Sequence, residues 1–78
     1  MLPTVDIFDE GDRLQVIAEL PGIDESDITH SVEGTHLILN AVRGERKIFK
    51  KIDLGSAVKG EPTTHYKNGI LEMQFTKA

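Results

Sequence analysis

The side chains of this chain that could do chemistry are its three histidines, two of which, His30 and His65, lie in predicted strands. His30 takes a position where the alternation predicts an aliphatic residue, and His65 precedes an Asn-Gly pair. A metal site would need a third ligand or a carboxylate at fixed spacing, which these histidines lack. We expect a half-buried His30 with one hydrogen bond, an exposed His65, and no metal or cofactor; a pH-sensitive or metal-binding pair is the less favoured alternative.

The acids occur in pairs, Asp9-Glu10 and Asp24-Glu25, both within predicted turns. Glycosidase-type chemistry needs two carboxylates facing each other in a cleft, one of them in apolar surroundings, whereas acids in turns are solvated. Asp27 is better explained as a turn or capping residue. The chain has no cysteine and no glycine-rich turn followed by Gly-Lys-Ser/Thr, so thiol chemistry and ATP-driven action are not indicated. We expect a non-enzymatic protein without catalytic residues.

Charge is distributed unevenly along the 78 residues, whose net charge is -4. Acids dominate residues 1–33, whereas five bases lie close together: Arg43, Arg46, Lys47, Lys50 and Lys51. A nucleic-acid surface would need aromatic side chains for stacking, and this segment offers only Phe49. A solvated strand face is the simpler explanation. No apolar run reaches membrane-spanning length and residues 1–6 form no leader, so we expect a soluble cytoplasmic protein that binds neither nucleic acid nor membrane.

Six glycines, at positions 11, 22, 34, 44, 55 and 69, separate short alternating runs at intervals of 10 to 14 residues. A strand with its turn takes about 8–12 residues, so this spacing is the pattern of a β-sandwich. Three hairpins are predicted, at Gly34-Thr35, near Gly44, and at Asn68-Gly69, the strongest type I′ signal. The connections at 21–27 and 53–62 are predicted as loops, the first with one helical turn at most. The sequence thus predicts one all-β domain over residues 1–78, an immunoglobulin-like antiparallel sandwich of about seven strands.

Alternation also fixes which side chains face the core, because a strand places successive residues on opposite faces. It predicts a set of buried residues, namely Val16, Leu37, Leu39, Leu71 and Phe75. It predicts exposure for Glu72 and Gln74 on the last strand.

Three segments resemble a known family. Ala18–Ile23 (AELPGI) followed by Asp27-Ile28 resembles the signature of the α-crystallin domain of small heat-shock proteins, in the branch shared by archaea, bacteria and plants. Pro3–Ile7 (PTVDI) is similar to the family's entry to that domain, and Tyr66–Leu71 (YKNGIL) to its closing hairpin. The three occur in order and span nearly the whole chain. The resemblance implies the same sandwich and a role in binding other proteins.

The chain departs from the family pattern in several places. The family carries a long excursion with an exchanged strand between the positions of Val42 and Glu45, where this chain has two residues. Two residues extend at most about 7 Å, too short to reach a partner subunit. The terminal arms and the isoleucine-x-isoleucine tail are also not in this sequence. Lys50 replaces the family's arginine, Leu54-Gly55 its Leu-Pro, and 62–64 (PTT) its apolar-x-Ala.

The leading functional hypothesis is an ATP-independent chaperone (holdase) that binds partly unfolded proteins in an apolar groove between two sheet edges. By resemblance, six residues line this groove: Ile28, His30, Val32, Thr64, Tyr66 and Leu71. The polar run 63–65 (TTH) predicts weak client binding. The alternative is an adaptor domain that docks on one specific protein, which the missing excursion favours.

The predicted strand at 45–52 supplies an assembly hypothesis. Its bases Arg46, Lys47, Lys50 and Lys51 would protect an exposed sheet edge from indiscriminate pairing. We expect a monomer, or a weak dimer that pairs these edges, and neither the strand-exchanged dimer nor a large shell.

Overall fold

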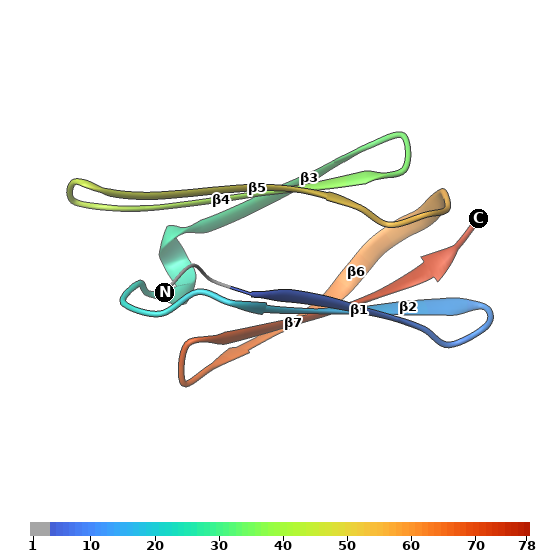
Figure 1. Cartoon of the computed structure of the whole chain (residues 1–78), viewed down its shortest axis with the longest axis horizontal. Coiled ribbons are helices and arrows are strands. Elements are labelled where there is room, and N and C mark those ends of the chain that lie inside the picture. Colours follow the sequence, from blue (N-terminus) through green and yellow to red (C-terminus); the bar gives the residue numbers. More distant parts are fainter. Residues whose placement is uncertain (1–3) are drawn as a thin grey trace.

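The computed structural model describes residues 4–78, whose strands form two stacked antiparallel sheets (Figure 1). Pro3, which opens the PTVDI motif, lies outside the described residues. In chain order the elements are β1 (Val5–Asp9), β2 (Arg13–Glu19), the short 3-10 helix η1 (Glu25–Asp27), β3 (Ile28–Glu33), β4 (His36–Arg43), β5 (Arg46–Asp53), β6 (Val58–Lys67) and β7 (Ile70–Lys77). The first sheet has the order β1-β2-β7-β6 and the second the order β3-β4-β5. The prediction of a seven-stranded antiparallel sandwich is confirmed.

Three tight turns form as the sequence predicts. Asn68 and Gly69 both have positive φ (53° and 78°), as a type I′ turn requires. Gly34 and Gly44 have positive φ (62° and 60°) at the first central position of their two-residue turns, which fits type II′. Gly44-Glu45 therefore closes the third hairpin, and β4 passes directly to β5 through two residues.

The core lies between the inner strands of the two sheets. Its members come mainly from β2, β4 and β7, and they are Leu14, Val16, Ala18, Leu20, Ile23, Leu37, Leu39, Ala41, Ile52, Leu54, Leu71, Met73 and Phe75. All five residues that the alternation predicts as buried are in this set, and Glu72 is exposed. Among the edge strands, β5 adds the buried Ile52, and the other apolar residues that β1, β3, β5 and β6 pack against the core are half-buried, namely Val5, Ile28, Ile48, Val58 and Tyr66.

Three expectations are wrong. The predicted loop 53–62 is mostly strand, because β6 begins at Val58 and tolerates Gly60 and Pro62 within a break of register between Lys59 and Thr63. Gln74 is half-buried rather than exposed, since β7 lies inside its sheet with neighbours on both sides.

The third concerns β3, where we expect a half-buried His30. His30 and Val32 are exposed instead and only Ile28 is half-buried. β3 is the outermost strand of its sheet, so its inward face lies at the margin of the sandwich.

Candidate functional site

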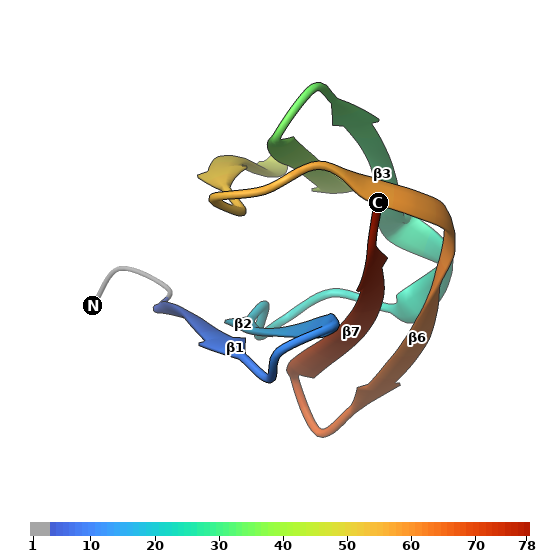
Figure 2. The same ribbon diagram turned by 90° about the vertical axis from the view of Figure 1, so that its right-hand side faces the viewer.

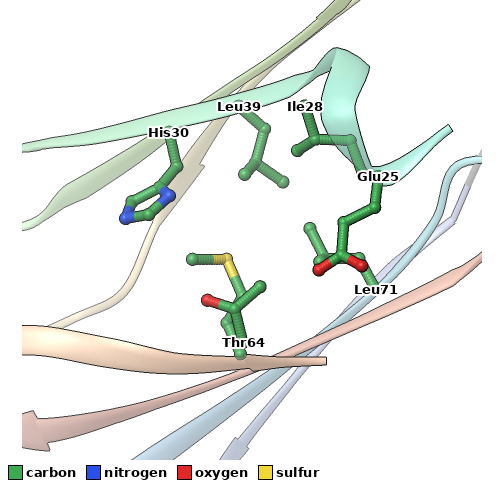
Figure 3. Close-up of a pocket in the computed structure, with 7 residues that line it drawn as sticks. Glu25, Ile28, His30, Leu39, Thr64 and Leu71 are labelled. Carbon is green, nitrogen blue, oxygen red and sulfur yellow. The ribbon is translucent and has the colours of Figure 1, made fainter. Parts of the chain in front are cut away.

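A cavity of about 210 Å³ lies between the two sheets on the side where β3 and β6 are the edge strands. It is lined by Glu25, Ile28, His30, Leu39, Thr64, Leu71 and Met73. Figure 3 shows Ile28, His30 and Leu39 pointing from one sheet toward Thr64 and Leu71 on the other. An apolar cavity of about 150 Å³ can hold a benzene-sized group, so this space suits an aliphatic side chain. The floor of the cavity consists of three residues of the buried core, Leu39, Leu71 and Met73.

Polar groups stand around this apolar floor. Glu25, from η1, adds a carboxylate to the lining of the cavity (Figure 3). Nε2 of His30 lies 3.5 Å from Oε2 of Glu61, an ion pair when the imidazole is protonated. The His30 side chain keeps 31% of its surface exposed and the residue as a whole is exposed, so the expectation of a half-buried histidine is wrong; its polar partner is Glu61. This contact links the edge strands β3 and β6.

The loop that carries Glu25 is held by local hydrogen bonds and by Arg43. The Asp24 N–H donates to Oδ2 of Asp27 (2.9 Å), and the Asp27 N–H donates to the Asp24 carbonyl (2.9 Å). Asp27 is thus a capping residue, as its position before Ile28 predicts. The Arg43 guanidinium pairs with Asp24 and lies 3.4 Å from Asp27, and these carboxylates raise the pKa of Arg43. The β4–β5 turn is thereby tied to this loop.

Tyr66 holds the same loop from the opposite sheet. Its hydroxyl lies 2.6 Å from the Leu20 carbonyl and 3.1 Å from the Ile23 carbonyl, and it donates to this pair. Burial, followed by the negative charges of Asp24 and Asp27, raises the pKa of the Tyr66 phenol. The side chain therefore fixes the end of the loop instead of lining the cavity.

The six residues predicted for the groove thus separate in space. Ile28, His30, Thr64 and Leu71 meet around the cavity. Val32 lies farther along β3, beside a second hollow of about 370 Å³ that also includes His30 and Glu61. Tyr66 is outside both sets.

Three cavity residues were not predicted from the sequence: Glu25, Leu39 and Met73. The alternation predicts that Leu39 is buried, and it places Met73 on the same face of its strand as the buried Leu71. The sequence pattern therefore indicates that both residues are buried, but it does not indicate that they line a cavity. No sequence pattern indicated that Glu25 lines the cavity, because the position of an acid in a loop depends on the path of the loop.

The polar run 63–65 (TTH) does not lie on one face of β6. Thr64 faces the cavity, whereas Thr63 and His65 pair with Gln74 and Glu72 on the outer face. His65 is exposed, as expected.

The basic strand β5 is the outermost strand of the second sheet. Its alternation sends the predicted bases to two faces: Arg46 and Lys50 share the inner face with Ile48 and Ile52, and Lys47 and Lys51 lie on the outer face with Phe49. Lys50 is half-buried, while Lys47 and Lys51 are exposed. The Arg46 guanidinium approaches Gly22. The four bases therefore do not form one continuous patch.

Two further observations concern residues 4–78 as a whole. In this part of the chain, no three His, Asp or Glu side chains come together as a metal ion would require. Over the same residues, no helix is long and apolar enough to cross a membrane.

Known proteins share both the sequence and the fold of this chain, although no family model matches it. A probable 15 kDa heat shock protein of Leptospira interrogans is 24% identical over 99% of this chain and 71% of its own length. The crystal structure of the Del-C4 mutant of hsp14.1 from Sulfolobus superposes with a TM-score of 0.85 at 30% identity, over 97% of this chain and 75% of that one. A small heat-shock protein from Xylella fastidiosa gives 0.78 at 26% identity, over 99% and 86%.

The chain is a β-sandwich of the α-crystallin type and belongs to the small heat-shock protein family. Members of this family are chaperones, a class that generally lacks enzymatic activity.

Proposed function

We propose that the protein is an ATP-independent holdase that captures extended, partly unfolded polypeptides on its β3–β6 side. The observation that carries the proposal is the cavity, whose apolar floor of Leu39, Leu71 and Met73 opens between two edge strands. An aliphatic client side chain that enters the cavity leaves water, which stabilises the complex by about 25 cal/mol per Å² of apolar surface buried. A client held there cannot aggregate through the same side chains.

The client backbone pairs with β3 by β-augmentation. β3 offers six consecutive residues at a sheet edge, whereas β6 contains a break of register and Pro62, which has no N–H to donate. In this arrangement every second client side chain faces the cavity. Binding is weak, because the cavity is small and Thr64 and Glu25 add polar groups to its wall. Residues 1–78 act in this role as one domain, in the cytoplasm, where the absence of cysteine suits a reducing environment.

The test is the suppression of client aggregation, followed by light scattering without ATP. Thr64→Glu places a charge at the cavity and should abolish most of the protection, because an unpaired charge beside buried aliphatic groups is costly. Thr63→Glu is the matched control: it makes the same change on the same strand, is also exposed, and faces the other side of the sheet, where its cross-strand partner is the uncharged Gln74. Thr64→Val should increase protection.

Both charged variants should keep the wild-type circular dichroism and Tm, since the substituted residues are exposed. Equal protection by the Thr64→Glu and Thr63→Glu variants would contradict the proposed site. Wild-type protein that leaves the aggregation of several clients unchanged would contradict the holdase function and favour the adaptor.

A further inference from the structure

The second open side of the sandwich is bordered by β1 and β5. Figure 2 shows β1 at the outer margin of one sheet and β5, in yellow, at the outer margin of the other, on the same side of the molecule. Both strands run in the same direction along the long axis (Figure 1). The two strands belong to different sheets, so they do not pair with each other within one chain.

These two edges have complementary sequences. Residues 5–10 read VDIFDE and residues 46–51 read RKIFKK, so each has a central Ile-Phe pair, flanked by acids in one and by bases in the other. Side by side in the same direction, the segments align as Val5 with Arg46, Asp6 with Lys47, Ile7 with Ile48, Phe8 with Phe49, Asp9 with Lys50 and Glu10 with Lys51. Ile7 and Phe8 then meet Ile48 and Phe49, and each of the three acids meets a base; the first pair, Val5 with Arg46, is the one that does not match.

The parallel alignment is favoured because it places inward-facing side chains beside inward-facing ones, and outward-facing side chains beside outward-facing ones. Ile7 and Ile48 both point inward, since they pair with the buried Val16 and Ala41 of the neighbouring strands. Phe8 and Phe49 both lie on outer faces, where they are 48% and 62% exposed. An antiparallel alignment of the same segments would place Phe8 beside Ile48 and so bring an outer face next to an inner one.

We propose that two copies of this chain form a dimer in which β1 of each copy pairs with β5 of the other. A two-fold axis parallel to the strands generates both contacts at once, so the interface is closed and each sheet becomes a continuous sheet of seven strands. Pairing of β5 with β5 of the other copy is disfavoured, because it would bring bases together. The dimer leaves the β3–β6 side open and is independent of the proposed holdase function.

Two of the aligned acid–base pairs are expected to attract each other across the interface, because all four side chains are exposed: Asp6 with Lys47, and Glu10 with Lys51. Asp9 is already engaged by Nζ of Lys77 at 2.8 Å, so its alignment with Lys50 is not needed. Because the ion pairs lie at the rim, dissociation should increase with salt.

Sedimentation equilibrium over a concentration series at low salt tests the dimer. The wild type should approach twice 8.6 kDa. Asp6→Lys/Glu10→Lys and Lys47→Glu/Lys51→Glu should each raise the dimer dissociation constant about tenfold or more, since each brings like charges together at both contacts. An equimolar mixture of these two variants should recover the dimer, because both contacts of the heterodimer are again complementary. Lys59→Glu/Lys67→Glu, which makes the same charge change on β6, should leave the dimer unchanged.

A wild type that stays at 8.6 kDa throughout the series, or a mixture that stays monomeric, would overturn the proposal. Thiol cross-linking supplies a second readout in this cysteine-free chain. Phe8→Cys and Phe49→Cys proteins should give covalent dimers with a short bifunctional reagent only when mixed. Efficient cross-linking of the Phe49→Cys protein with itself would show β5–β5 pairing and would also overturn the proposal.

Discussion

The β3–β6 side and the β1–β5 side both lie between edge strands, but they are built from different kinds of residue. The cavity on the β3–β6 side is lined by three residues of the core, Leu39, Leu71 and Met73. The β1–β5 side instead has two exposed aromatic residues, Phe8 and Phe49, among charged neighbours. A binding surface made from the core cannot change without a loss of stability. A surface made from exposed edge residues can change in charge and leave the fold intact. The predictions below test this difference.

The largest effect is expected on the first side. Leu71→Ala removes a fully buried side chain from both the core and the cavity floor. It should lower the free energy of unfolding by about 2–5 kcal/mol, measured by urea denaturation. Phe49→Ala on the second side should change it by less than about 0.5 kcal/mol when both proteins are measured as monomers at low concentration and high salt, since that ring is exposed in the single chain. Similar losses for the two variants would remove the distinction between the two sides.

A smaller effect is expected at the loop that ends the cavity. Tyr66→Phe removes the donor to the Leu20 and Ile23 carbonyls and should cost about 1–2 kcal/mol in the same assay. Because the pKa of Tyr66 is raised above its ordinary value of 10.0 in the folded state, the unfolded chain ionises first as pH rises. Wild-type stability should therefore fall above pH 10, and the Phe variant should lose less over that range. Equal alkaline slopes would contradict the assigned role of the hydroxyl.

The smallest effect is expected on β1. Asp9 accepts hydrogen bonds from Lys77 and from the Gly11 N–H, which lower the pKa of the Asp9 carboxyl below its ordinary value of 3.8. Such a group stabilises the fold above its unfolded pKa, and this contribution disappears as pH falls through the lower folded value. Asp9→Asn should decrease Tm slightly at neutral pH and not in strong acid. A decrease that persists in acid would mean that the substitution acts on the turn and not on the charge.

The sequence predicted local features well. Asn68-Gly69 and Gly44-Glu45 specify their turns through positive φ, and alternation assigned the buried face of β7, because these depend on residues close together in the chain. The start of β6 was missed, because Gly60 and Pro62 are typical of a loop and only pairing with β7 shows that the strand passes through them.

Features that depend on distant segments could not be predicted. The hydroxyl of Tyr66 finds its partners 46 and 43 residues earlier in the chain. The exposure of Val32 follows from the position of β3 at the edge of its sheet. Glu25 lines the cavity from a loop that contacts Arg43, a residue of the distant β4.

The central claim is that clients bind on the β3–β6 side alone. Titration of the 15N-labelled protein with an extended aliphatic peptide tests it most directly, because backbone amide shifts report each strand separately. The account predicts concentration-dependent shifts at 28–32 on β3 and around Thr64 on β6, with β1 and β5 unchanged. Shifts confined to Val5–Asp9 and Arg46–Asp53 would contradict it and would assign client binding to the charged side.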